Sequence, residues 1–352
     1  MERFVDDMIA KSTAMCKGRK FIKYPTKWSL FNDATDNLQI DKMDSSIQFK
    51  GKNIIFVASF SDNAVTMSQF HMIVYLCECF ASTVTVLLPY YSTGTMERVD
   101  IGDDGVVPTA NTLALLFSGL PLVGRPVRVM TYDLHTLQNR FYVGGRALAS
   151  LHTAIPLVHR LVRERNNGIN AIAFPDEGAH KRFRNLFKGA GLGPDDVIIC
   201  SKVRDGDKKV IKISDGRPEG KHVLIIDDQT KSGGTLIECA KAIIRMSSTT
   251  KVSAFVTHAI CTDEFWSKFT PDETGDIPIN KFKMFYTTDS IPGLKEAMEL
   301  GIHRVLNWTK TAPDKTGNLI TTPYDRDANI SGDSIGKKIT ILPLAELILR
   351  DL

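Results

Sequence analysis

The sequence predicts an α/β protein built on parallel sheets, and three features of its 352 residues lead to this class. Short apolar runs such as Asn53 to Ser59 and Val223 to Ile226 recur along the chain and indicate strands buried on both faces. Segments with helical spacing of apolar residues, such as Met67 to Phe80, separate these runs. Polar and charged residues repeatedly follow the runs, where open α/β sheets bind their ligands. Two similar domains facing each other across a cleft would explain why both halves show this pattern.

The individual elements follow from this alternation. Strands are predicted where β-branched and apolar residues are continuous: Asn53 to Ser59, Ser82 to Pro89, Val127 to Tyr132, Ala171 to Phe174, Val197 to Cys200, Val210 to Ile213, Val223 to Ile226, Lys251 to His258, Lys281 to Thr287, Arg304 to Leu306 and Ile339 to Leu342. Helices are predicted where apolar residues recur every three to four positions: Met67 to Phe80, Thr109 to Leu120, Thr153 to Arg165, His180 to Phe187, Leu236 to Ile244 and Leu344 to Leu349.

The chain is long enough for two domains with separate cores. We expect an N-terminal domain over residues 1–160, with residues 339–352 as a candidate for completing it, and a C-terminal domain over residues 161–306. Residues 307–338 are polar and rich in Thr, Asp, Gly and Pro, so they are interpreted as an inserted loop.

Composition limits the classes of function. With 43% hydrophobic residues, 24% charged residues and a net charge of +4, the chain is typical of a soluble globular protein and gives no reason to expect nucleic-acid binding. The six cysteines are scattered without C-x-x-C spacing, which favours buried free thiols in a reducing compartment over a zinc site. No apolar run reaches transmembrane length, and the N-terminus has no signal-peptide core, so we expect a cytoplasmic protein without a membrane partner.

The most informative stretch is VLIIDDQTKSGGT, in which an apolar strand, an acidic pair, a glycine turn and a helix follow one another. Glycines let backbone N–H groups converge on an anion, and a helix N-terminus adds partial positive charge. The ionised carboxylates of Asp227 and Asp228 only accept hydrogen bonds, which suits the hydroxyls of a sugar. The candidate ligands of a sugar phosphate are therefore Asp227, Asp228, Thr230, Lys231, Ser232, Gly233, Gly234 and Thr235. The alternative is an acidic strand end and a glycine turn in some other α/β protein; the G-K-[ST] of a Walker loop is missing.

A second candidate site lies at the ends of two other predicted strands. Asp133 and His135, two residues apart, could bind a divalent metal ion, with Asp176 as a second carboxylate. Mg²⁺ usually takes one or two protein groups and completes its shell with water and substrate phosphates. The alternative is that His135 is a structural histidine at a strand end.

Lys202 and Arg204 stand in a charged segment that contains Gly206. Together they could hold a polyphosphate, because Arg offers a planar fork and Lys a point charge. The composition suggests a mobile loop that closes over a bound nucleotide. The alternative is a solvated, charged hairpin turn.

Taken together, these segments resemble the ribose-phosphate diphosphokinases, which are the phosphoribosyl pyrophosphate (PRPP) synthetases. The resemblance runs from about Trp28 to Leu306 and resumes over Ile339 to Leu349. It is carried, in chain order, by Phe31 to Ala34, Pro89 to Arg98, the DLH of Asp133 to His135, the PDEGAHKR of Pro175 to Arg182, the KxR of Lys202 to Arg204, and the PRPP loop of Asp227 to Thr235. The motifs are moderately specific one by one, but their order and spacing are highly specific. Details such as Thr93 to Arg98 are similar to the plant-type class of the family.

The resemblance implies two phosphoribosyltransferase-like domains related by pseudo-twofold symmetry. It also implies transfer of the β,γ-diphosphoryl group of ATP to the C1 hydroxyl of ribose 5-phosphate, giving PRPP and AMP for nucleotide biosynthesis. By the same resemblance Lys202 and Arg204 are catalytic; Asp33, Arg98 and His135 bind ATP; Asp133, His135 and Asp176 hold Mg²⁺. The family further implies a homo-oligomer. Two alternatives remain at this point: a nucleobase phosphoribosyltransferase, and a non-catalytic regulatory homologue that binds synthetase subunits.

Overall fold

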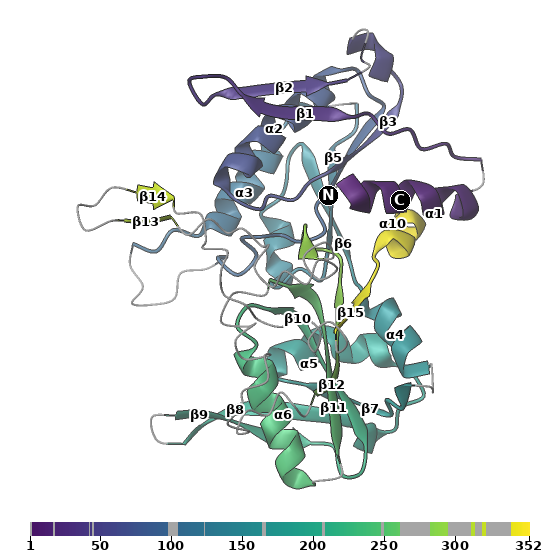
Figure 1. Cartoon of the computed structure of the whole chain (residues 1–352), viewed down its shortest axis with the longest axis vertical. Coiled ribbons are helices and arrows are strands. Elements are labelled where there is room, and N and C mark those ends of the chain that lie inside the picture. Colours follow the sequence, from purple (N-terminus) through teal and green to yellow (C-terminus); the bar gives the residue numbers. More distant parts are fainter. Residues whose placement is uncertain are drawn as a thin grey trace, which may run out of the picture. The chain divides into compact units, whose positions relative to one another are not determined.

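Figure 1 shows the computed structural model of the chain, which describes residues 2–16, 18–41, 43, 46–97, 105–122, 124–163, 167–205, 208–247, 250–260, 282–294, 311–313, 319–321 and 339–352. The chain divides into two compact units. The first comprises Met1–Leu157, Ser290–Pro292 and Pro343–Leu352, and the second comprises Val158–Asp289 and Gly293–Leu342. Among the described residues, no helix combines the length and the apolar character needed to cross a membrane.

The first unit contains a sheet of four parallel strands: β3 (Asn53–Val57), β4 (Thr83–Leu87), β5 (Val127–Tyr132) and β6 (Ala147–His152), in that order. Helices α2 (Asn63–Glu78) and α3 (Thr109–Ser118) connect the first three strands. Phe60, Phe70 of α2 and Phe117 of α3 pack ring against ring, with centroids 5.1 to 5.7 Å apart. This aromatic cluster anchors both helices on the sheet.

Two further parts complete the first unit. Strands β1 (Thr26–Leu30) and β2 (Asp36–Ile40) form a separate antiparallel hairpin. Helices α1 (Glu2–Met15) and α10 (Ala345–Asp351) lie side by side, although they come from opposite ends of the described chain (Figure 1). An ion pair of 3.1 Å joins Lys11 of α1 to Glu346 of α10, and the apolar face of α10 is buried. Two short 3₁₀ turns, Ser46–Phe49 and Leu137–Phe141, also belong to this unit.

The second unit is built on a seven-stranded sheet in the order β15-β12-β11-β10-β7-β8-β9. All neighbours are parallel except β8 and β9, which form an antiparallel hairpin at one edge. The strands are β7 (Ala171–Phe174), β8 (Val197–Asp205), β9 (Lys208–Asp215), β10 (His222–Thr230), β11 (Lys251–Ala259), β12 (Phe282–Thr288) and β15 (Ile339–Leu342). The helices described in this unit are α4 (Ile155–Arg163), which begins in the first unit, α5 (Glu177–Phe183) and α6 (Gly234–Met246), and 3₁₀ turns are described at Arg184–Phe187 and Pro194–Asp196. The central strands β7 and β10 are almost wholly buried, as their continuous apolar sequences require.

Both sheets confirm the predicted α/β class with parallel strands. The sequence pattern predicts no strand over Ala147 to His152, where the structure has β6; this edge strand is mostly only partly buried, so its sequence lacks a continuous apolar run. The segment 339–352 is divided between the units, because β15 belongs to the sheet of the second and α10 to the first. The strand predicted at Arg304 to Leu306 lies outside the described residues. So does most of 307–338, in which the structure describes the short antiparallel pair β13 (Thr311–Pro313) and β14 (Leu319–Thr321).

Candidate active site

The loop between β10 and α6 has the geometry of an anion site. Gly233 takes the left-handed conformation with φ of 73°, which glycine adopts without steric cost, and its N–H donates to the Thr230 hydroxyl over 3.1 Å. Helix α6 begins at Gly234, and its N-cap residue Gly233 has no side chain that could cap it. The first amides of a helix have no partner within the helix, so those of α6 are left for a ligand at its positive end. Of the six predicted residues, Lys231, Ser232 and Gly233 form the turn, Thr230 is the last residue of β10, and Gly234 and Thr235 are the first residues of α6.

Asp227 and Asp228, the acidic pair near the end of β10, have different surroundings. Asp228 is buried and forms an ion pair of 2.8 Å with Arg182 of α5, which is itself largely buried. Asp227 lies one residue earlier, and burial, followed by the negative charge of Asp228, raises the pKa of its carboxyl group well above its usual range. Asp176 adds to this repulsion. Three carboxylates therefore gather in the second unit, and only protons, hydroxyl donors or cations can relieve their mutual repulsion.

Asp176 is shared between a helix and a lysine. It stands just before α5 in extended conformation, where one carboxylate oxygen accepts the Ala179 N–H over 3.0 Å. The other oxygen accepts from Lys202 Nζ over 2.9 Å. Burial opposes ionisation of Asp176, but the Ala179 amide and the Lys202 ammonium outweigh it and lower the pKa of this carboxyl group.

Lys202 and Arg204 lie within strand β8, not in the loop that the sequence suggests. Both residues belong to the paired part of the hairpin: Lys202 pairs with Ile211 and Arg204 with Lys209, and the pair of Asp205 with Lys208 follows. The alternation of charged residues with Val and Ile on both strands explains this, because such alternation is typical of strands.

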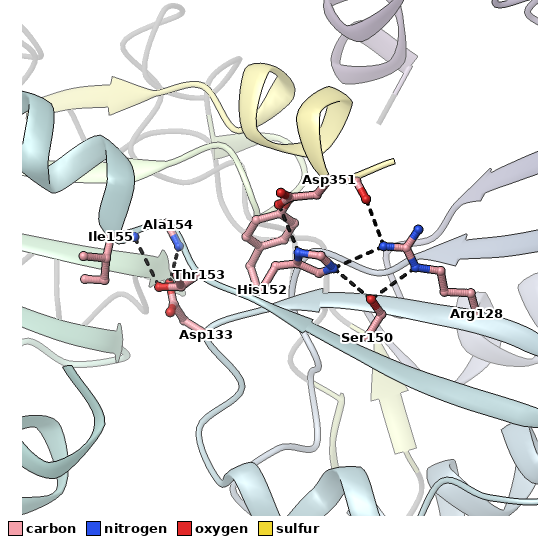
Figure 2. A network of polar contacts seen from close by, with 9 residues as sticks. Arg128, Asp133, Ser150, His152, Thr153, Ala154, Ile155 and Asp351 are labelled. Carbon is pink, nitrogen blue, oxygen red and sulfur yellow. Dashed lines mark hydrogen bonds and ion pairs between the residues drawn. The ribbon is translucent and has the colours of Figure 1, made fainter. Parts of the chain in front are cut away.

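The predicted metal residues Asp133 and His135 belong to the first unit and follow β5. Asp133 is 5% exposed, has a φ of 38° and accepts the Ala154 N–H over 2.9 Å through its carboxylate, at the start of α4 (Figure 2). Its own N–H donates to the His152 carbonyl over 2.9 Å. Asp133 is thus fixed by its main chain and by its side chain, and His135 follows two residues later, partly buried.

Besides His135, two more residues of the first half are predicted to bind the nucleotide, Asp33 and Arg98. Asp33 is exposed in the turn between β1 and β2, where its carboxylate accepts the Thr35 hydroxyl over 2.6 Å and the Thr35 N–H over 3.0 Å. These two hydrogen bonds lower the pKa of Asp33. Arg98 lies outside the described residues.

The structure therefore brings together, within the second unit, Asp176, Lys202, Asp227 and Asp228 with Arg182. Sequence reasoning gave Arg182 no role; the signal available was its place in the PDEGAHKR motif, a few residues after Asp176 on a short helix. Within the described part of the chain, no three His, Cys, Asp or Glu side chains are grouped so that they could hold a metal ion by themselves.

The fold and this site define an α/β protein with an anion-ready glycine loop and an acidic pair at the end of a central strand. Comparison with protein-family models finds no match. The chain is 39% identical over 273 residues to ribose-phosphate pyrophosphokinase 4 of Oryza sativa subsp. japonica, covering 77% of this chain and 80% of the relative. It is 40% identical over 267 residues to the chloroplastic ribose-phosphate pyrophosphokinase 3 of the same plant, but there the match spans 62% of the relative's length.

The solved structure of phosphoribosylpyrophosphate synthetase from Mycobacterium smegmatis superposes with a TM-score of 0.65, over 98% of this chain and 92% of that one. Its sequence identity is 16%, so this likeness supports the fold alone. The chain belongs to the ribose-phosphate pyrophosphokinase family, and the resemblance to the plant members that the sequence predicts is confirmed.

Proposed function

We propose that the chain is an ATP-dependent ribose-phosphate diphosphokinase, which transfers the β,γ-diphosphoryl group of ATP to the C1 hydroxyl of ribose 5-phosphate and releases PRPP and AMP. The observation that carries the proposal is the uncapped start of α6 directly after Asp227 and Asp228, in a chain that belongs to the pyrophosphokinase family. Neither a nucleobase phosphoribosyltransferase nor a non-catalytic homologue is favoured by the relatives, which are named as pyrophosphokinases.

The second unit would bind the acceptor sugar. The amides and hydroxyls of Thr230 to Thr235 would bind the 5-phosphate, because the Gly233 turn leads into the N-terminus of α6, whose dipole favours negative charge. Asp227 would accept from a ribose hydroxyl, which would reduce its repulsion with Asp228. Arg182 would keep Asp228 in place through their ion pair.

Lys202 would change partners during the reaction. In this structure it holds Asp176, which leaves its side chain 47% exposed. An exposed ion pair contributes little to stability, so the ammonium can leave Asp176 for the more highly charged triphosphate at small cost. There Lys202, with Arg204, would stabilise the charge that develops during an in-line displacement, which depends on positioning and electrostatics. Arg98 and Asp33 are proposed to bind the nucleotide.

The residues present fit a magnesium ion. Carboxylate oxygens are the ligands that Mg²⁺ prefers, and burial together with the nearby carboxylates Asp228 and Asp176 raises the pKa of Asp227, so a cation is favoured at this edge of the sheet. We propose Asp133 and His135 in the first unit, and Asp176 in the second, each as a candidate ligand of the ion. When bound together with ATP, the ion would neutralise charge on the phosphate oxygens.

The test is incubation of the purified chain with ATP, Mg²⁺ and ribose 5-phosphate, followed by separation of the nucleotides. We expect AMP and PRPP in equal amounts, and no AMP when ribose 5-phosphate is omitted. ADP instead of AMP, or no turnover, would contradict the proposal. Light scattering of the same preparation tests the proposed homo-oligomer. Fluorescence microscopy of the tagged chain tests the expected cytoplasmic location, which the chloroplastic relative leaves open.

A further inference from the structure

Helix α10 forms polar contacts with β5 and β6, the strands that end just before Asp133 and its partner Ala154. Asp351, at the end of α10, accepts from the Tyr132 hydroxyl over 3.0 Å through a carboxylate oxygen. The same oxygen lies 3.0 Å from His152 Nδ1. Arg128 donates to the main-chain carbonyl of Asp351 over 3.0 Å. Arg128 and Tyr132 belong to β5 and His152 ends β6, so one residue ties two neighbouring strands together (Figure 2).

In this network one assignment of donors and acceptors satisfies all the hydrogen bonds. Ser150 accepts from Arg128 Nε over 3.1 Å, and its hydroxyl lies 2.9 Å from His152 Nε2. Arg128 also approaches Nε2, to 3.4 Å. Because arginine only donates, Nε2 is the accepting nitrogen, and the proton of a neutral imidazole is on Nδ1, facing Asp351. The Tyr132 hydroxyl donates to the Asp351 carboxylate, which can only accept. Every donor that points at Asp351 therefore meets an acceptor.

The network ends where the candidate nucleotide and metal segment begins. Tyr132 directly precedes Asp133, and the His152 carbonyl accepts the Asp133 N–H over 2.9 Å. Two residues after His152, the Ala154 N–H donates to the Asp133 carboxylate. A shift of Tyr132 or His152 would thus move both the main chain and the side chain of Asp133, and with them His135. Asp133 has a positive φ, a conformation that costs a non-glycine residue energy and persists only when its surroundings hold it.

We propose that Asp351 is a positioning residue for the Asp133 to His135 segment, acting from the last helix through Tyr132 and His152. The proposal rests on the proposed function for its kinetic consequence. Asp351 touches neither substrate; it fixes the ends of β5 and β6, so its loss acts on the nucleotide side of the reaction and spares the ribose 5-phosphate loop in the second unit.

The kinetic test uses three variants of the full chain. Asp351→Ala removes the shared oxygen; since small misplacements at a reacting centre are costly, we expect the KM for ATP to rise about tenfold. The KM for ribose 5-phosphate stays unchanged. Asp351→Asn keeps an accepting oxygen and restores most of the ATP affinity. The control is Lys11→Gln, which removes the ion pair between α1 and α10 without touching either strand, and its KM for ATP stays within about twofold because exposed ion pairs contribute little.

A second readout does not require turnover. The imidazole signals of His135 in the NMR spectrum, assigned by their loss in His135→Ala, should shift in Asp351→Ala and stay in place in Lys11→Gln. If Asp351→Ala does not fold, Tyr132→Phe is used instead, because it removes a single hydroxyl. It should raise the KM for ATP and shift the His135 signals in the same direction, but by less. Unchanged ATP kinetics and unchanged His135 signals in the folded variants would overturn the proposal. If wild type releases no AMP, the proposed function fails, and the His135 signals alone decide the role of Asp351.

Discussion

Helices α5 and α6 begin at the carboxyl ends of neighbouring strands of one sheet, but their first turns are completed in different ways. At α5 the carboxylate of Asp176 accepts the Ala179 amide. At α6 the residue in the same position is Gly233, which has no side chain that could cap the helix. The start of α5 therefore carries negative charge and binds the Lys202 ammonium, whereas the start of α6 keeps its amides for an anion.

The difference between the two helix N-termini shows how one edge of a sheet can bind a cation at one helix and an anion at the next. Both helices have a dipole that favours anions at the N-terminus, but a carboxylate cap cancels this preference and makes the position attractive to cations. A phosphate is expected at α6 and a cation at α5, with Asp227 and Asp228 between them on β10. By the same rule we expect a cation near Asp133, because its carboxylate accepts the Ala154 amide at the start of α4.

The largest effect is expected from the cation at the acid-capped helix. Lys202→Ala should lower kcat for AMP release by about a hundred- to a thousandfold, which is the usual cost of losing one donor to the transition state. The Kd for ribose 5-phosphate, measured by calorimetry, should not change. Lys212→Ala, which removes a lysine from the paired strand β9, is the control and should retain wild-type kcat. A Lys202→Ala enzyme with normal turnover would remove this residue from the mechanism.

The next largest effect should come from closing the open helix. Ser232→Asp places a carboxylate at the start of α6, where it repels a phosphate, and like charges brought together cost several kcal/mol. We expect the Kd for ribose 5-phosphate to rise about a hundredfold, equivalent to about 3 kcal/mol. The uncharged Ser232→Asn variant has nearly the same shape and separates charge from size. Equal binding by the two variants would show that the anion lies elsewhere.

The conformation of the loop can be tested without ligand. Gly233 has a φ of 73°, and a left-handed conformation costs an ordinary residue roughly 1–2 kcal/mol, so Gly233→Ala should lower the free energy of unfolding in urea by about that amount. Gly234 is the matched control, because it is the first residue of α6 and an added Cβ would meet only the Ser232 hydroxyl, at 3.6 Å. Gly234→Ala should leave stability unchanged or raise it. A stable Gly233→Ala protein would mean that the loop does not need this backbone.

Sequence reasoning identified those parts of the site that are local in the chain. The strand, acidic pair, glycine turn and helix of Val223 to Ile244 follow one another, so periodicity and turn chemistry are sufficient. The α/β class was equally accessible, because continuous apolar runs indicate strands buried on both faces. The position of Lys202 within a strand could not be predicted, because a charged run that contains a glycine is typical of a loop as well as of a hairpin.

The missing parts depend on tertiary contacts. Arg182 matters because α5 packs beside β10 and brings it to Asp228, and no spacing along the chain encodes that contact. The contacts of Asp351 are even less predictable, because its partners Tyr132 and His152 lie about 200 residues earlier in the sequence, on strands in the first half of the chain. Whether Asp33 and Arg98 contact a nucleotide stays a prediction.

The smallest expected effect is a gain in stability, and it comes from replacing Asp227. The folded state raises the pKa of Asp227, so the native protein holds a proton here that the unfolded chain releases above about pH 4. Stability attributable to this group therefore falls as pH rises from that point towards the folded pKa. Asp227→Asn should raise the free energy of unfolding at pH 7, and the difference from wild type should vanish below about pH 4. Asp228→Asn is the contrast, because it breaks the buried pair with Arg182 and should destabilise the protein. Urea titrations over this pH range measure both variants, and a less stable Asp227→Asn protein at pH 7 would show that the acidic pair stabilises the fold and is not a strained feature kept for ribose.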